Sequence, residues 1–224
     1  MPQLTTNSAS PAPVTAALYQ ADAAQWEALF GFAAEAREHS HAALSGWSGR
    51  DVEYGAALGL ALANNAPGQQ TNLADDLAKR FPDDTLVRFN YLPTLRAQIA
   101  LNRDQPSQAI EVLQASVPYE LGTLEAYGFP QALLPVYVRG EAYLATHRGP
   151  EAAVEFQKVL NHRGIVFNEP IGALAHLQLG RAYVLSGDDT KARSAYQDFL
   201  SLWKDADPDV PILKEARAEY AKLK

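Results

Sequence analysis

A repeat with a period of 40 residues constrains the fold of this 224-residue chain more than any other feature. Gly140 and Gly180 begin two matching segments, "GEAYLATHRGPEAAVEF" and "GRAYVLSGDDTKARSAY". In both segments the glycine is followed by an alanine twelve residues on and by an aromatic residue sixteen residues on. The matched positions are Ala142 and Ala182, Tyr143 and Tyr183, Ala152 and Ala192, Phe156 and Tyr196, Gln157 and Gln197, and Leu160 and Leu200. Self-similarity at such a spacing indicates stacked supersecondary units.

Each repeat unit has the pattern of two helices joined by a short turn. The second half of the last unit carries an apolar stripe at helical spacing, made by Ala192, Tyr196, Phe199, Leu200 and Trp203. Between the halves lie "HRGP" and "SGDD", in which a proline and two carboxylates suit the first turn of a helix. The missing side chains of the two glycines predict that the paired helices approach closely, with the aromatic ring of Phe156 or Tyr196 filling the space behind.

Weaker copies of the unit lie upstream. The equivalent small residues are assigned to Ala61, Ala97, Gly140 and Gly180, at spacings of 36, 43 and 40 residues. The longest interval contains "VPYELGTLEAYGFPQ", which predicts an irregular insert at residues 118 to 131. The sequence therefore predicts an all-α fold, a right-handed superhelical solenoid of about five helical hairpins closed by a capping helix. The predicted hairpins span residues 15–46, 51–81, 85–117, 132–162 and 170–204, the capping helix spans 210–223, and all form a single domain, 15–224.

Charge and composition exclude several classes of function. Acidic residues outnumber basic ones by 26 to 19, which gives a net charge of −7 and argues against binding to nucleic acid or to an anionic membrane. The chain has no cysteine, so disulfides, thiolate metal sites and thiol nucleophiles are excluded. Neither a cofactor nor a resident metal is expected.

The ends and the apolar runs bear on location. The opening residues, "MPQLTTNSASPAPVT", have neither a basic head nor an apolar stretch, and residues 1–14 are expected to form a flexible lead-in. The longest apolar run, from Tyr54 to Ala63, is about half of what a membrane helix needs. We therefore expect no membrane insertion and a cytoplasmic location, with the periplasm left open.

The last unit resembles a known repeat family. In "LAHLQLGRAYVLSGDDTKARSAYQDFL" the tetratricopeptide pattern is matched by Leu179, Gly180, Tyr183, Gly187, Ala192 and Tyr196. Over about residues 20 to 224, segments such as "RFPDDTLVRFNYLPTLRAQIALNRDQPSQAIEVLQ" and "LWKDADPDVPILKEARAEYAKLK" resemble the C-terminal tetratricopeptide region of acidobacterial-type serine/threonine protein kinases and winged-helix regulators. The resemblance implies the interaction or sensory module of a bacterial signalling protein. The kinase motifs are missing, and no basic recognition helix is present, so neither activity carries over.

Residues that suggest chemistry have simpler explanations. His39 and His41 stand two apart, so on a helix they point to different sides and do not form a metal pair. Three adjacent carboxylate pairs, at 75–76, 83–84 and 188–189, each lie beside a predicted helix end, where capping explains them. Trp26 and Trp203 stand at helical spacing and are expected in the core. No catalytic residue is therefore assigned, and the chain is not expected to be an enzyme.

The remaining expectation is a non-catalytic scaffold for protein–protein interaction. In stacked hairpins the first helices line a concave groove, which suits a peptide or protein partner. The groove residues predicted from the repeat offset are Tyr91, Thr94, Gln98, Asn102, Tyr137, Glu141, Leu177 and Arg181. On this interpretation, the double variant Tyr137→Ala, Arg181→Glu abolishes binding and leaves the array folded. Two alternatives stay open: a structural repeat protein that forms homo-oligomers, and a fragment of a kinase whose catalytic domain is absent.

Overall fold

The structure, a computed structural model, describes residues 11–64, 68–122 and 133–223, and this part of the chain contains helices and no strand. Of the predicted flexible lead-in, residues 1–10 lie outside the described residues, and residues 11–14 are helical, so the lead-in prediction is wrong there. Most of the predicted insert, residues 123–131, also lies outside the described residues. The all-α prediction is confirmed for the described part.

The helices follow the predicted hairpins closely, with one short addition between the last two. Their bounds are α1 Pro11–Phe30, α2 Ala33–Gly46, α3 Arg50–Leu62, α4 Gln69–Arg80, the π-helix η1 Val87–Tyr91, α5 Leu92–Asn102, α6 Pro106–Val112, the 3₁₀-helix η2 Leu113–Tyr119, α7 Leu134–Ala145, α8 Gly149–Asn161, α9 Arg163–Val166, α10 Pro170–Leu185, α11 Asp189–Leu202 and α12 Pro211–Ala221. The sequence pattern did not predict the one-turn helix α9.

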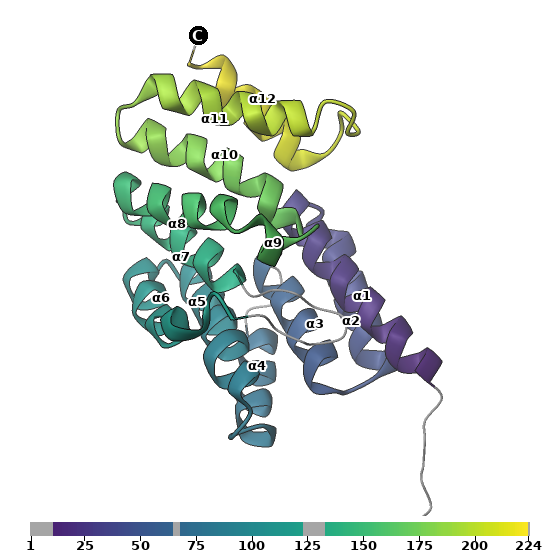
Figure 1. Ribbon diagram of the computed structural model, residues 1–224. Helices are drawn as coiled ribbons and strands as arrows, with labels where there is room; N and C mark the ends of the chain where they lie inside the picture. Colours follow the sequence, from purple (N-terminus) through teal and green to yellow (C-terminus); the bar gives the residue numbers. More distant parts are fainter. Residues whose placement is uncertain (1–10, 65–67, 123–132, 224) are drawn as a thin grey trace, which may run out of the picture.

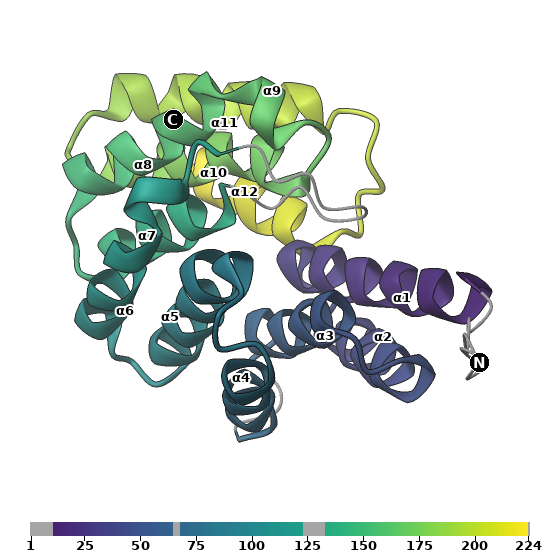
Figure 2. The ribbon, with the colours of Figure 1, turned by 60° about the horizontal axis from the view of Figure 1, so that its bottom comes forward.

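Consecutive helices pack in pairs, and the pairs pack on one another in chain order (Figure 1). The pairs are α1 with α2, α3 with α4, α5 with α6, α7 with α8, and α10 with α11. The first helix of each later pair also packs on both helices of the pair before it. The helices from α3 to α12 thus follow one another around an arc (Figure 2).

The glycines at the centre of the repeat lie under aromatic rings, as predicted. A Cβ atom added to Gly140 would lie 2.6 Å from two atoms of the Phe156 ring, and one added to Gly180 would lie 2.8 Å from the Tyr196 ring. Both rings are buried. The close approach within the last two helix pairs therefore depends on the absence of a side chain at these two positions.

A second repeat appears only in the backbone. The turns after α3, α5, α7 and α10 each contain a residue with positive φ, namely Asn64, Asp104, His147 and Gly187. These residues lie 40, 43 and 40 residues apart, and each ends its helix in a left-handed conformation. Counting back seven residues from each gives Ala57, Ala97, Gly140 and Gly180. The small residue of the second pair is therefore Ala57, and the prediction of Ala61 was wrong by one helical turn.

The first helix meets the far end of the array. The α1 helix packs on α12, and its end contacts the segment between α11 and α12 (Figure 2). The rings of Phe30 and Trp203 meet edge to face with centroids 5.1 Å apart. A Cβ on Gly31 would lie 2.7 Å from Cβ of Pro211. Trp26, which was expected in the core, is instead 37% exposed and lies near Glu169, just before α10.

We expect Gly140→Ala to lower the free energy of unfolding by about 1–3 kcal/mol, because the added methyl group overlaps the Phe156 ring in a packed interior. Urea unfolding followed by circular dichroism measures the loss. The matched control is Gly164→Ala, since nothing lies within 4 Å of a Cβ at that position. An equal effect at the two glycines would contradict the packing argument.

We expect His147→Gly to raise the free energy of unfolding by about 0.5–1 kcal/mol, because His147 holds φ at 58°, where glycine has no steric cost. The same measurement on His41→Gly serves as the control, because His41 lies in the interior of α2, where glycine should cost about 1 kcal/mol. If both variants lose stability, the turn after α7 is not strained.

Candidate interaction groove

The residues predicted to line an open groove are mostly enclosed between helices. Tyr91, Thr94 and Leu177 have no exposed surface, Tyr137 is 2% exposed and Gln98 is 8% exposed. The expected exposure of these five side chains is therefore wrong. The reason is that the first helices of successive pairs pack side by side, so the face that carries these residues is used in packing.

In the first half of the predicted set, the polar groups are used within the fold. The Tyr91 ring stacks on Tyr54 with centroids 3.7 Å apart, and its hydroxyl donates to Oδ1 of Asp51 at 2.9 Å. Asn102 donates from Nδ2 to the carbonyl oxygen of Ala61 at 2.6 Å. Gln98 donates to Oδ1 of Asn102 at 3.2 Å. The contacts of Tyr91 and Asn102 join η1 and α5 to α3, and the bond between Gln98 and Asn102 lies within α5, so all of them are structural.

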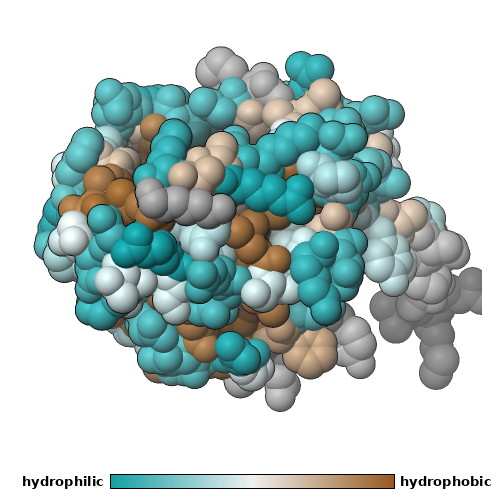
Figure 3. Space-filling model, turned by 90° about the horizontal axis from the view of Figure 1, so that it is seen from above, coloured by the Kyte–Doolittle hydropathy of each residue, from teal (hydrophilic) through white to brown (hydrophobic). Residues whose placement is uncertain are grey.

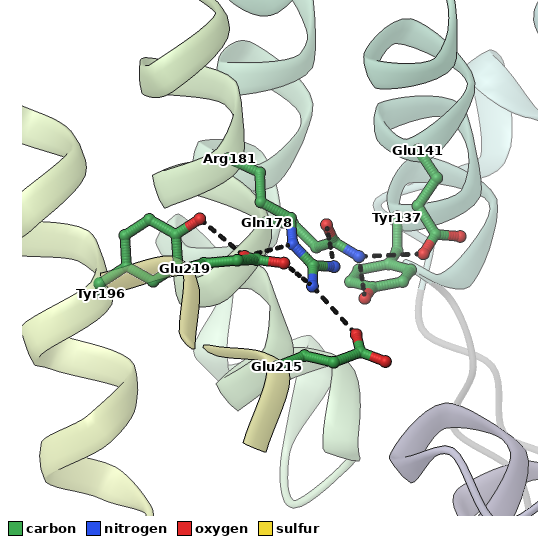
Figure 4. Close-up of polar contacts among 7 residues, drawn as sticks. All are labelled: Tyr137, Glu141, Gln178, Arg181, Tyr196, Glu215 and Glu219. Atoms are coloured by element: carbon green, nitrogen blue, oxygen red, sulfur yellow. Dashed lines mark hydrogen bonds and ion pairs between the residues drawn. The ribbon is translucent and has the colours of Figure 1, made fainter. Parts of the chain in front are cut away.

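In the second half of the set, Tyr137, Glu141 and Arg181 belong to a polar network that continues onto the last helix (Figure 4). Gln178 donates from Nε2 to the hydroxyl of Tyr137 at 3.0 Å and to Oε1 of Glu141 at 3.1 Å. Arg181 holds Glu219 of α12 through two hydrogen bonds, of 2.9 Å from Nε and 2.8 Å from Nη2. Tyr196 donates to the same carboxylate at 2.8 Å. The network therefore binds the capping helix rather than a partner.

The pKa values reflect this enclosure. Burial raises the pKa of Glu141 to about 7, although the charge of Arg181 acts in the opposite direction. The pKa of Glu219 is lowered by its hydrogen bonds and charge interaction with Arg181, which outweigh the effect of burial. The double variant Tyr137→Ala, Arg181→Glu is consequently expected to destabilise the fold, because it empties a buried site and sets a carboxylate against Glu219.

The other sequence candidates are also accounted for structurally. His39 contacts Glu27 through Nδ1 at 2.6 Å, and the described residues contain no group of three or more potential metal ligands. Asp84 and Asp188 accept backbone N–H groups at helix starts, as predicted. Asp76 does not cap a helix: it lies inside α4 and pairs with Arg80 at 2.8 Å. No helix within the described ranges is long and apolar enough to cross a bilayer.

An open groove lies elsewhere, between the ends of α8 and α11. It consists of two adjoining hollows of about 320 and 350 Å³ that share Arg163, His176 and Leu202, and we call it the α8–α11 groove. Its lining comes from α8, α9, α10 and α11 and from the turn between α9 and α10. Viewed from above, the molecular surface is largely hydrophilic, with separate hydrophobic patches (Figure 3). The groove residues are Val159, Leu160, Arg163, Val166, Phe167, Asn168, Glu169, Gly172, Ala173, His176, Asp198, Ser201 and Leu202.

Two large apolar side chains at this groove face solvent. Phe167 is 78% exposed and Leu202 is 61% exposed. Phe167 also has φ of 55° and ψ of −119°, a conformation that costs a residue with a side chain about 1–3 kcal/mol. Strain of this kind, combined with an exposed aromatic ring, is typical of functional positions.

Of the two basic side chains at the groove, only one has a carboxylate partner among the described residues. Arg163 is exposed, and none of the described carboxylates lies within ion-pair distance of it. His176 approaches Asp198 at 3.8 Å, yet burial and the charge of Arg163 lower its pKa below the usual value. At neutral pH the groove thus offers one guanidinium without an ion-pair partner in the described part of the chain and one neutral imidazole, and it also contains the carboxyl groups of Glu169 and Asp198 beside the apolar side chains.

Sequence reasoning missed this groove, although a weak signal was available. Leu202 follows Phe199 and Leu200 but falls outside the apolar stripe of α11, and Phe167 stands next to the helix start at Pro170. Apolar residues off the helix stripe are candidates for exposure.

Comparisons with protein-family models, with curated proteins and with solved structures found no match to this chain.

We expect Glu141→Gln to raise the free energy of unfolding by about 1–3 kcal/mol at pH 8 and to change it little at pH 4. The raised pKa of about 7 means that the stability contributed by protonated Glu141 is complete below its unfolded pKa and is lost as the pH rises through about 7. Glutamine stays neutral throughout. Urea unfolding at several pH values measures the difference, with the exposed variant Glu111→Gln as control. A gain that is independent of pH would contradict this account.

Proposed function

We propose that this protein is a non-catalytic interaction module that binds a peptide segment of a partner protein in the α8–α11 groove. The observation that carries the proposal is the strained and exposed Phe167 beside exposed Leu202 and Arg163. A fold retains such strain and such exposed apolar surface at a cost, which a binding partner offsets.

The chemistry of the groove defines the partner segment. The exposed rings and aliphatic groups suit an aromatic or aliphatic anchor side chain. Arg163 suits a carboxylate next to that anchor, since its guanidinium offers paired donors. We therefore propose a segment in which a large apolar residue is flanked by aspartate or glutamate.

The architecture supports a module of this class. The pairwise packing and the turn repeat of 40, 43 and 40 residues are the features of a tetratricopeptide-like solenoid, and we propose that fold. The resemblance noted in the sequence further suggests a bacterial signalling protein as its setting. We place the binding site in the α8–α11 groove and not on the face expected from the sequence, because the residues of that face are enclosed between helices.

The variant Phe167→Gly tests the proposal most sharply, because stability and binding should change in opposite directions. Glycine relieves the backbone strain, so we expect the free energy of unfolding to rise by about 1 kcal/mol. Loss of the ring should weaken binding about tenfold or more. The probe is a synthetic peptide selected on the wild-type protein from a library of random displayed peptides, and its binding is measured by fluorescence anisotropy.

Three further variants make the test specific. Leu202→Asp should weaken binding of the same peptide. Tyr19→Ser should leave binding unchanged, because it alters an exposed ring on α1, away from the groove. Arg163→Glu should also weaken binding of the peptide. Replacing the acidic residue of the peptide by lysine should restore binding to that variant. Unchanged affinity for Phe167→Gly and Leu202→Asp would refute the groove. If sedimentation instead shows an oligomer that Leu202→Asp dissociates, the surface serves self-association.

A further inference from the structure

A second cavity lies where η1 faces η2 and the start of α7. Its volume is about 340 Å³, within the usual range for small-molecule sites. Its lining includes Leu86, Phe89, Ser116, Pro118, Tyr119 and Pro135. We infer that this cavity binds a small, uncharged aromatic molecule that carries one hydrogen-bonding group. The inference does not depend on the α8–α11 groove.

Two aromatic rings give the cavity a flat apolar surface. Phe89 of η1 and Tyr119 of η2 stack with centroids 4.3 Å apart and planes inclined by 19°. Tyr119 is 45% exposed, so part of this surface is open. Stacked or edge-to-face contact with a further ring is favourable at such a surface.

A buried hydroxyl supplies the polar element. Ser116 is 1% exposed, and its Oγ atom has no hydrogen-bond partner. An unpaired buried hydroxyl is costly, at about 1–3 kcal/mol, and such groups are rare in native structures. Because Ser116 lines the cavity, a polar group on a bound molecule can satisfy it.

The backbone at this cavity is distorted for a definite reason. Residues Val87–Tyr91 form a π-helix, in which the N–H of Leu92 donates to the carbonyl of Val87. Pro93 follows and has no N–H to donate to Phe89, so the regular hydrogen-bond ladder is interrupted there. The π-turn places Phe89 at the cavity, and π-turns are frequent at functional sites.

The charges near the cavity compensate one another, which favours an uncharged ligand. Glu120 lines the cavity, but its carboxylate pairs with Arg139 and Lys158. Arg139 also donates to Glu155 at 2.6 Å. Arg88 lies outside the cavity lining, with its guanidinium 5.0 Å from the centre of the Phe89 ring. A charged ligand would therefore lose its hydration without gaining a free counter-ion among the described residues that line the cavity.

Indole and 1-methylindole are the probes, because a methyl group replaces the N–H of indole in 1-methylindole, whose ring nitrogen therefore cannot donate a hydrogen bond. Binding to the full chain is measured by saturation-transfer NMR and by titration. We expect both to bind and indole to bind more tightly. Ser116→Ala should weaken the binding of indole about three- to tenfold, because the variant loses one hydrogen bond to the ring N–H. The affinity for 1-methylindole should stay unchanged. Phe89→Leu should weaken both probes.

Two more variants distinguish a loss of binding at the cavity from a loss of folding. Thr85→Trp changes an exposed residue at the edge of the cavity, so it should block both probes without disturbing the core. Ser45→Ala removes an exposed hydroxyl from α2 and should change neither affinity. Absence of saturation transfer at millimolar probe, or affinities that Ser116→Ala, Phe89→Leu and Thr85→Trp all leave unchanged, would overturn the inference.

Discussion

The packing of an aromatic ring on a bare helix backbone is the contact on which the array depends. Phe156 lies against Gly140, and Tyr196 lies against Gly180, at distances that exclude a Cβ atom. The two helices of each of these last two pairs therefore approach closely, and their first helices, α7 and α10, pack side by side. Phe156 also meets Tyr137 edge to face, with centroids 5.6 Å apart. Tyr137 belongs to the face that was predicted to line an open groove, so the same ring packs α8 on α7 and helps to bury that face. Close packing within the pairs and enclosure of that face have one cause.

Much of the fold could be predicted from the sequence, because periodicity and small residues directly report helix faces. The hairpins and the role of the two glycines follow from that information. The register of the second pair could not be predicted, since it is set by left-handed turn residues. Gly187 marks such a turn plainly, whereas Asn64, Asp104 and His147 belong to residue types that are enriched at positive φ but adopt it in only a minority of cases. The longer turn before α4 likewise placed Asp75 and Asp76 inside a helix instead of at its end.

The candidate sites were harder to predict, because exposure is a property of the assembled array. The repeat offset correctly grouped Tyr137, Glu141 and Arg181 in space, yet it could not show that Gln178 joins them or that Glu219 of α12 covers Arg181. The exposure of Phe167 depends on one unusual backbone conformation. The burial of Ser116 depends on a 3₁₀-helix that continues from α6. Neither feature has a periodic signature, so a sequence pattern could not distinguish these residues from ordinary ones.

The contact between α1 and the α11–α12 segment alters how such an array can come apart. In an open stack of repeats the terminal units have one neighbour each and fray independently of one another. Here Phe30 and Gly31 rest on Trp203 and Pro211, so the first and last units also have each other as neighbours. Separation at either end must break this contact and expose apolar surface on both sides. Backbone amides of α1 and of α12 should therefore share the same slow hydrogen exchange, although some 180 residues of chain lie between them.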